Sequence, residues 1–192
     1  MKTIKENIDN EIVIKNSRFI CYMIKITSDD INSIINEIKE KHPKATHYCY
    51  AFIYDDIKRS SDDNEPSGTA GQPILNVLEK EELNHVLAVV VRYFGGIKLG
   101  AGGLIRAYTK SVTETLKISE FVELIKGYKI RLRFNYTEGK NINYILKDSR
   151  ITNKEYHDDI HYECYIDERL LKYLDKYTPQ ILEEGYIEKT QL

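Results

Sequence analysis

A glycine-rich segment flanked by positive charges is the part of this sequence best suited to chemistry. Seven of the ten glycines fall between Gly68 and Gly103, and a run such as GGIKLGAGG carries a conformational-entropy cost that needs an offsetting reason. One such reason is anion binding, because a glycine-rich loop that leads into a helix presents unpaired N–H groups at the positive end of the helix dipole. The alternative is that the glycines let a helix pack tightly over a sheet. The anion-site interpretation assigns contacts to Arg92, Tyr93, Phe94, Gly95, Gly96, Lys98, Gly100, Gly102, Gly103, Arg106 and Lys110.

The familiar nucleotide signatures do not fit this segment. Gly95 to Gly100 has the spacing of a Walker A motif, but Ala101 and Gly102 stand where Lys and Ser or Thr belong. The run from Gly100 to Gly102 begins a dinucleotide fingerprint, but Ile105 occupies the position of its third glycine. The sequence therefore supports neither ATP nor NAD binding, and we predict no cofactor.

An acidic segment, SSDDNEPSGTAGQP, precedes the glycine-rich run. Clustered carboxylates can coordinate Mg²⁺ or Ca²⁺ through oxygen, but the spacing does not match an EF-hand. Ser67 lies in S-G-T rather than in a G-x-S-x-G elbow, so a hydrolase nucleophile has no support. The favoured interpretation is a solvated loop whose side chains cap turns and the next helix, without a metal. As a second part of the site, this loop would contribute Asp62, Asp63, Glu65, Ser67 and Thr69.

Two further candidates for chemistry have simpler explanations. His47 and Cys49 share one face of a predicted strand, but no third group is evident to orient a catalytic Cys–His pair, so burial in the sheet is favoured. Tyr93 and Phe94 could stack on bases or pack in the core. The three cysteines are widely spaced and include no CxxC pair, so they are interpreted as buried apolar residues in a reducing compartment. We predict no catalytic residue and no metal site.

The charge is distributed unevenly along the chain. The net charge is −2, which argues against a protein coated in basic residues. Residues 55–82 contain eight acids and three bases, giving −5, whereas residues 83–118 contain five bases and one acid, giving +4. A local field of this kind attracts a ligand whatever the total charge is.

Hydrophobic periodicity predicts an α+β protein with two domains. The first domain, residues 1–126, is predicted to contain strands, helices and a buried central strand around LAVVV. The second, residues 127–192, is predicted to be a strand–helix–strand–strand–helix module of the ferredoxin-like type. Predicted strands of the first domain cover 10–16, 18–26, 46–54 and 85–94, with helices from Ile31, Pro73 and Leu104 and a loop over 55–71. Predicted strands of the second cover 128–136, 151–157 and 160–166, with helices from Lys140 and Asp167.

The chain shows no membrane or export signal. No apolar run approaches the ~20 residues that a membrane helix needs, and the first residues lack a signal-type apolar stretch. We therefore expect a cytoplasmic protein.

Two long motifs resemble the signature of the IMPACT/YigZ family in its bacterial two-domain form. They are SDDNEPSGTAGQPIL and VVVRYFGGIKLGAGGLIRAYTKSV, and the early SRFI and HYCYA segments also fit. The resemblance covers essentially the whole chain. Asn64 departs from the family's usual glycine in D-G-E-P, but Asn tolerates left-handed backbone, so the turn is expected to persist.

The resemblance implies a first domain with a fold like domain IV of elongation factor G and a ferredoxin-like second domain like its domain V. Eukaryotic relatives are translation regulators that restrain a stress kinase by competing for its ribosome-associated activator. Those relatives use an additional protein-binding domain, so we do not expect that partner here. For the bacterial members, a nucleic-acid- or ribosome-linked role follows from fold similarity only.

Three hypotheses for function remain open. The leading one is a non-enzymatic protein that binds RNA or the ribosome and acts in translation regulation, with phosphate contacts from Arg92, Lys98, Arg106 and Lys110. The alternative is a metal-dependent enzyme acting on a small phosphorylated substrate, which requires the acidic loop to converge on the glycine-rich loop. A module for protein interaction is the third.

Overall fold

The computed structural model describes residues 1–189, which divide into two compact units. The first unit is Met1–Val122 and the second begins at Glu123. This division falls inside one long strand, β7 (Phe121–Phe134), and residue 126, where the sequence predicted the domain boundary, lies in the same strand.

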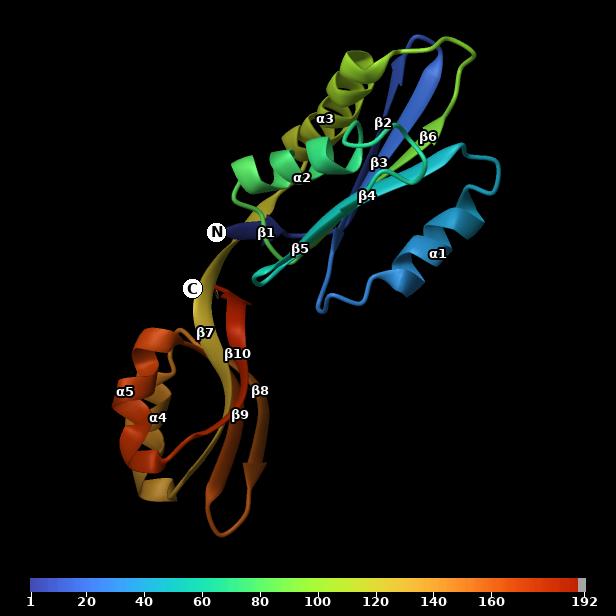
Figure 1. The fold of residues 1–192 in the computed structure, drawn as a ribbon. Helices are drawn as coiled ribbons and strands as arrows, with labels where there is room; N and C mark the ends of the chain where they lie inside the picture. Colours follow the sequence, from blue (N-terminus) through green and yellow to red (C-terminus); the bar gives the residue numbers. More distant parts are fainter. Residues whose placement is uncertain (190–192) are drawn as a thin grey trace. The chain divides into compact units, whose positions relative to one another are not determined.

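The first unit is built on a five-stranded antiparallel sheet with strand order β2-β3-β6-β4-β5 (Figure 1). The central strand is β6, whose VLAVVVR run is buried throughout because helices cover both of its faces. The strands are β2 (Ile8–Ile14), β3 (Ser17–Lys25), β4 (His47–Tyr54), β5 (Ile57–Ser61) and β6 (Val86–Tyr93).

Helices lie on both faces of this sheet and create two cores. Helix α1 (Asn32–Lys41) covers one face, where Ile35 and Ile38 pack with Leu87, Val89 and Val91. Helices α2 (Gly71–Lys80) and α3 (Ala101–Lys117) cover the other face (Figure 1). Their core contains Ile74, Leu78, Tyr108 and Val112 together with Cys21, Ala88 and Val90. Alternate residues of β6 thus enter opposite cores, which is the side-chain alternation of a strand.

Three elements of the first unit differ from the sequence prediction. Strand β5 lies within the segment predicted as a loop, because its IKRSS sequence is mostly exposed and carries no apolar alternation. Helix α3 begins at Ala101, so Gly102 and Gly103 belong to its first turn rather than to the preceding loop. The short strand β1 (Lys2–Ile4) was not predicted; beside it, the Lys5 amide donates to the Glu120 carbonyl at 2.8 Å.

The second unit is an antiparallel sheet with strand order β8-β9-β7-β10 and helices on one face (Figure 1). Its strand–helix–strand–strand–helix–strand order is the complete ferredoxin-like pattern, so the predicted two-domain α+β fold class is confirmed. The sequence prediction missed the last strand. It also predicted one helix from Asp167 where the structure has three short helical turns over residues 168–177. The elements after β7 are η1 (Tyr136–Glu138), α4 (Gly139–Ile145), β8 (Arg150–Tyr156), β9 (Ile160–Asp167), η2 (Glu168–Leu170), α5 (Leu171–Leu174), η3 (Asp175–Tyr177) and β10 (Gln180–Glu188).

None of the helices within residues 1–189 is long and apolar enough to cross a membrane.

Gly95 fixes the start of the glycine-rich segment against the β2–β3 turn. Lys15 and Asn16 form this turn with positive φ values of 45° and 64°, as a two-residue hairpin requires. A Cβ atom added at Gly95 would lie 2.1 Å from the carbonyl carbon of Asn16, which is backbone that cannot rotate away. The packing explanation for the glycines therefore holds at this position.

We expect Gly95→Ala to destabilise the first unit by about 2 kcal/mol, because a methyl group there overpacks against fixed backbone. Gly102→Ala is the matched control: the added Cβ would meet only the Arg106 Nη1 atom at 3.6 Å, and alanine favours the helix by up to ~1 kcal/mol. Urea unfolding of both variants measures the difference. Equal effects of the two substitutions would contradict this packing.

Candidate functional site

The acidic loop is organised by the carboxylate of Asp62. One oxygen accepts the amides of Ala70 at 3.0 Å and Gly71 at 2.8 Å, and the other accepts the amide of Gly68 at 2.8 Å. These bonds satisfy amide groups at the start of α2 that a helix leaves unpaired. Partial burial alone would raise the pKa of Asp62, but the three amide bonds hold the pKa below its ordinary value. Asp62 is therefore an ionised cap for the helix, as the loop interpretation of the sequence proposed.

The turn that follows Asp62 uses left-handed backbone at two residues. Asp63 has φ 40° and Asn64 has φ 66°, so the expectation that Asn64 preserves the turn in place of glycine is confirmed. The Asp63 carboxylate accepts a hydrogen bond from the Tyr48 amide at 2.6 Å, and the backbone carbonyl of Asp63 accepts one from His47 Nδ1 at 2.8 Å. Farther along, the Thr69 hydroxyl donates to the Pro66 carbonyl at 2.6 Å. The turn is thus attached to the end of β4.

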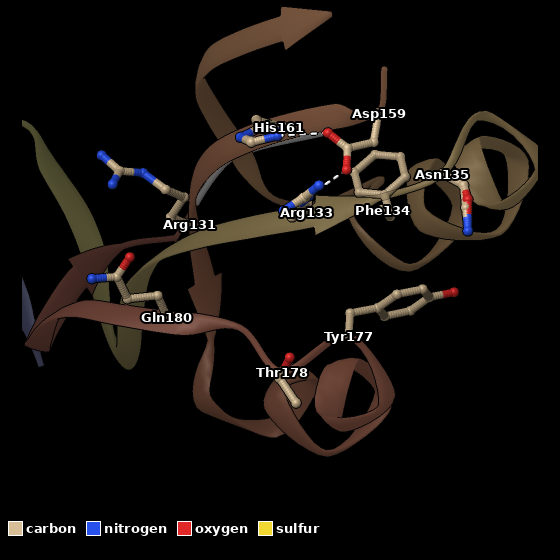
Figure 2. Close-up of a pocket in the computed structure, with 9 residues that line it drawn as sticks. All are labelled: Arg131, Arg133, Phe134, Asn135, Asp159, His161, Tyr177, Thr178 and Gln180. Atoms are coloured by element: carbon tan, nitrogen blue, oxygen red, sulfur yellow. Dashed lines mark hydrogen bonds and ion pairs between the residues drawn. The ribbon is translucent and has the colours of Figure 1, made fainter. Parts of the chain in front are cut away.

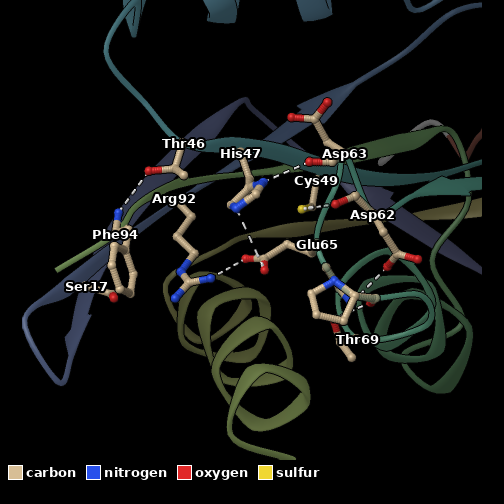
Figure 3. Close-up of polar contacts among 12 residues, drawn as sticks. Ser17, Thr46, His47, Cys49, Asp62, Asp63, Glu65, Thr69, Arg92 and Phe94 are labelled. Carbon is tan, nitrogen blue, oxygen red and sulfur yellow. Dashed lines mark hydrogen bonds and ion pairs between the residues drawn. The ribbon is translucent and has the colours of Figure 1, made fainter. Parts of the chain in front are cut away.

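The prediction of a solvated loop is wrong at Glu65 and Thr69, which are both buried. Glu65 enters the interior because its carboxylate meets Arg92 of the central strand (Figure 3). Its Oε1 atom accepts from Arg92 Nη1 at 2.5 Å and from the Tyr108 hydroxyl at 2.8 Å. Its Oε2 atom lies 3.8 Å from His47 Nε2. The side chains of Glu65 and Arg92 are only 4% and 5% exposed, so the pair is shielded from water and from salt.

Arg92 is therefore not positioned to contact a phosphate, as the anion-site interpretation had assigned it. Its guanidinium carbon lies 5.4 Å from the Phe19 ring centroid and 5.6 Å from that of Phe94. Its Nε atom is buried and lacks a hydrogen-bond partner among the described residues. A charge on the central strand without a partner would be costly, and Glu65 supplies that partner.

Cys49 and Tyr108 complete the buried polar group. The Cys49 Sγ atom lies 3.0 Å from the Asp62 carbonyl oxygen and 3.3 Å from the Tyr108 hydroxyl. Burial raises the pKa of both groups far above their ordinary values. The thiol therefore remains protonated and unreactive at neutral pH, which favours the structural explanation of Cys49 over a Cys–His catalytic pair.

The beginning of the glycine-rich segment has its amides engaged within the protein. The Phe94 amide donates to Thr46 Oγ1 at 3.0 Å, and the Gly95 amide donates to Ser17 Oγ at 3.1 Å. Gly96 and Gly100 adopt positive φ values of 84° and 72° and have open space around them. Only the later part of the segment is thus open to a ligand.

The cationic side chains of the anion-site interpretation that follow Arg92 in the chain are exposed, whereas Arg92 is buried. Lys98, Arg106 and Lys110 are all exposed, and within the part of the chain that the structure describes no hydrogen bond or ion pair holds the side chain of any of them. Arg106 Nη1 lies near Gly102 in the first turn of α3. Tyr93 is engaged instead, because its hydroxyl lies 2.9 Å from His42 Nδ1, whereas Phe94 is 46% exposed.

The two segments singled out in the sequence meet at the ion pair between Glu65 and Arg92. The carboxylates of Asp62 and Asp63 bind backbone amides, and Glu65 binds Arg92. No group of three or more His, Cys, Asp or Glu side chains within residues 1–189 is placed to hold a metal ion, so the enzyme alternative gains no support. Sequence reasoning missed Tyr108, Ser17 and Thr46. Tyr108 lies on the apolar stripe of a helix, and isolated hydroxyl residues carry no motif signal.

The protein is thus a two-unit α+β protein. Its first unit contains a buried ion pair between Glu65 and Arg92, and the loop that follows Arg92 carries the exposed Lys98. The Impact N-terminal domain family model matches residues 15–116. The chain belongs to the IMPACT family.

Relatives from two bacteria support this assignment. The IMPACT family member YvyE of Bacillus subtilis is 44% identical over 173 residues, which cover 87% of this chain and 80% of that protein. The IMPACT family member YigZ of Escherichia coli is 34% identical over 151 residues, 74% of each chain. A crystal structure described as a hypothetical protein is 28% identical with a TM-score of 0.66, and the alignment covers 94% of this chain and 95% of that one.

We expect Glu65→Gln to destabilise the first unit by about 3 kcal/mol, because it leaves the buried Arg92 charge without a counter-charge. Glu114→Gln, which removes an exposed partner of Lys117, is the control and should change stability little. Urea unfolding measures both. The double variant Glu65→Gln/Arg92→Met should lose less free energy of unfolding than the sum of the two single variants, because it leaves no unpaired charge in the interior. Additive single effects would contradict the pairing.

Proposed function

We propose that this protein is a non-enzymatic RNA-binding protein that acts on RNA, free or within the ribosome. The binding surface, called here the α3 cationic surface, consists of Lys98, Arg106, Lys110 and the first-turn amides of residues 101–103. The observation that carries this proposal is that Lys98, in the loop before α3, and Arg106 and Lys110, within α3, are exposed, and that no ion pair holds their side chains within residues 1–189. Glu114, one turn beyond Lys110, interacts electrostatically with that lysine.

Helix electrostatics support the choice of an anionic ligand. Helix α3 has 17 residues, and its N-cap is Gly100, which offers no side chain to accept the first amides. The start of a helix carries a partial positive charge that attracts anions and disfavours cations. Arg106 nevertheless reaches toward Gly102 in the first turn. A phosphate group beside these donors would satisfy the amides and relieve the repulsion between the helix dipole and the guanidinium.

Exposed apolar side chains beside the cations support a nucleic acid over a simple ion. Phe94, Ile97 and Ile105 are 46%, 44% and 42% exposed. Single-stranded nucleic acids bind where cations follow the backbone and an aromatic ring stacks on a base. Phe94 can take the stacking role, since the Arg92 guanidinium and the Thr46 hydroxyl hold its position.

Family membership supports placing this activity in translation. The resemblance of the first domain to domain IV of elongation factor G, and the translation-regulatory role of eukaryotic relatives, both favour RNA or the ribosome as the target. We infer a cytoplasmic location on the same grounds. The partner of the eukaryotic relatives is not carried over.

The double variant Lys98→Ala/Arg106→Ala should bind a single-stranded RNA roughly tenfold more weakly at low salt. Loss of two phosphate contacts should also reduce the slope of log K against log salt by about 1.4. Fluorescence anisotropy of a labelled 12-nucleotide RNA, titrated at several salt concentrations, measures both quantities.

A matched control removes two cations of the same unit that already have partners. Lys5→Ala/Lys117→Ala lowers the net charge equally, but these lysines pair with Glu120 and Glu114. This variant should bind RNA nearly as well as the natural protein. No RNA binding at low salt, or equal losses in both double variants, would contradict the proposed surface.

A further inference from the structure

The second unit leaves one face of its sheet uncovered by helices. Residues Ile130, Leu132 and Phe134 of β7 and Tyr162 and Cys164 of β9 point into the core beneath α4 and α5. The residues between them therefore point to the opposite face. On that face Arg131 lies across from Glu163, and Arg133 lies across from His161.

A cavity of about 480 Å³ lies where the β7–β10 pairing ends at Arg131 and Gln180, and its lining also includes Phe134 and Asn135 (Figure 2). Arg131, Arg133 and His161 line it from the sheet, and Gln180 lines it from β10. Figure 2 shows Tyr177, the last residue of η3, and Thr178, which follows it, on the side opposite Arg133 and His161. The size lies within the range of about 300–1,000 Å³ typical of small-molecule sites and is much larger than a single phosphate ion.

A single carboxylate, that of Asp159, holds both Arg133 and His161 in place. One oxygen of Asp159 accepts from Arg133 Nε, and the other lies 2.7 Å from His161 Nε2. The hydrogen bond from Arg133 lowers the pKa of Asp159, so this carboxylate is ionised at neutral pH. Arg131 is held similarly, because its Nε and Nη2 atoms donate to Glu163 at 3.0 Å and 2.5 Å.

These contacts leave donors of both guanidinium groups open to the cavity. No hydrogen bond to the terminal nitrogens of Arg133 or to Nη1 of Arg131 occurs among residues 1–189. The lining thus combines two fixed arginines with one carboxylate and has a formal charge of +1 with His161 neutral. Planar guanidinium forks with free N–H groups match the oxygens of a phosphate better than other side chains do.

We propose that this cavity binds a phosphate monoester attached to a body of nucleotide size, with Arg131 and Arg133 as the phosphate contacts. Such a group occurs on a free mononucleotide and on the phosphorylated end of an RNA strand. A second hollow of about 310 Å³ shares Arg131 and His161, but the carboxylates of Glu155 and Glu163 also line it, so the proposed phosphate site is confined to the larger cavity.

The test is an NMR titration of the ¹⁵N-labelled full chain with matched probes that differ only in the phosphate. Adenosine 5′-monophosphate is compared with adenosine, and a six-nucleotide RNA with a 5′-phosphate is compared with the same RNA carrying a 5′-hydroxyl. Resonances of Arg131, Arg133 and His161 should shift with the phosphorylated probes, and the affinity should exceed that of the unphosphorylated partner at least fivefold. Tighter binding of one phosphorylated probe than of the other shows whether the site prefers a free mononucleotide or the phosphorylated end of an RNA strand.

Arg133→Gln, and independently Arg131→Gln, should weaken binding of the phosphorylated probes roughly tenfold. Arg169→Gln is the control, because Arg169 is an exposed arginine paired with Asp167 in the same unit but outside the cavity. The Lys98→Ala/Arg106→Ala variant should retain phosphate-monoester binding, so this proposal and the RNA-binding proposal fail separately. Equal shifts with adenosine and its monophosphate, or equal losses in Arg133→Gln and Arg169→Gln, would overturn the proposal.

Discussion

The buried ion pair between Glu65 and Arg92 is the contact on which the rest of the first unit depends. Arg92 ends a strand that is covered on both faces, so its charge must be compensated inside the protein. The compensating carboxylate comes from a loop that would otherwise be free in solvent. The Tyr108 hydroxyl donates a hydrogen bond to the same carboxylate, and His47 lies close to it. The Glu65 carboxylate therefore links β4, β6 and α3 to the acidic loop.

This pairing separates cations that fold the protein from cations that are free to bind. Arg92 and the amides of Phe94 and Gly95 are committed to internal contacts. Lys98 and Arg106 follow later in the chain and lie on the surface. Of the two explanations for the glycine-rich segment, close packing holds at Gly95, and anion binding by the residues after it stays a prediction. In the second unit, carboxylates instead orient the arginines and leave part of each guanidinium free.

The sequence predicted those elements whose residues carry a strong local signal. LAVVV identified the central strand, the apolar stripe of α3 identified that helix, and the restart of alternation after residue 127 identified a second unit. Strands β5 and β10 were missed because IKRSS and QILEEGYIE lie mostly exposed and lack clean alternation. The role of Arg92 could not be predicted, because an arginine beside a glycine-rich loop has the same local sequence whether it binds a ligand or a carboxylate 27 residues earlier. The pairing of β4 with β6 brings the acidic loop, which is attached to β4, close to Arg92. That contact between distant segments cannot be read from the local sequence.

The most direct test of this account is native-state hydrogen exchange, followed by NMR, in the natural protein and in Glu65→Gln. If Glu65 holds the acidic loop in place, the amides of Tyr48 and Gly71, which bond to the loop carboxylates, should lose more protection than amides of the central β3–β6 pairing. A uniform loss across the first unit, or unchanged protection at Tyr48 and Gly71, would show that the loop does not depend on the buried ion pair.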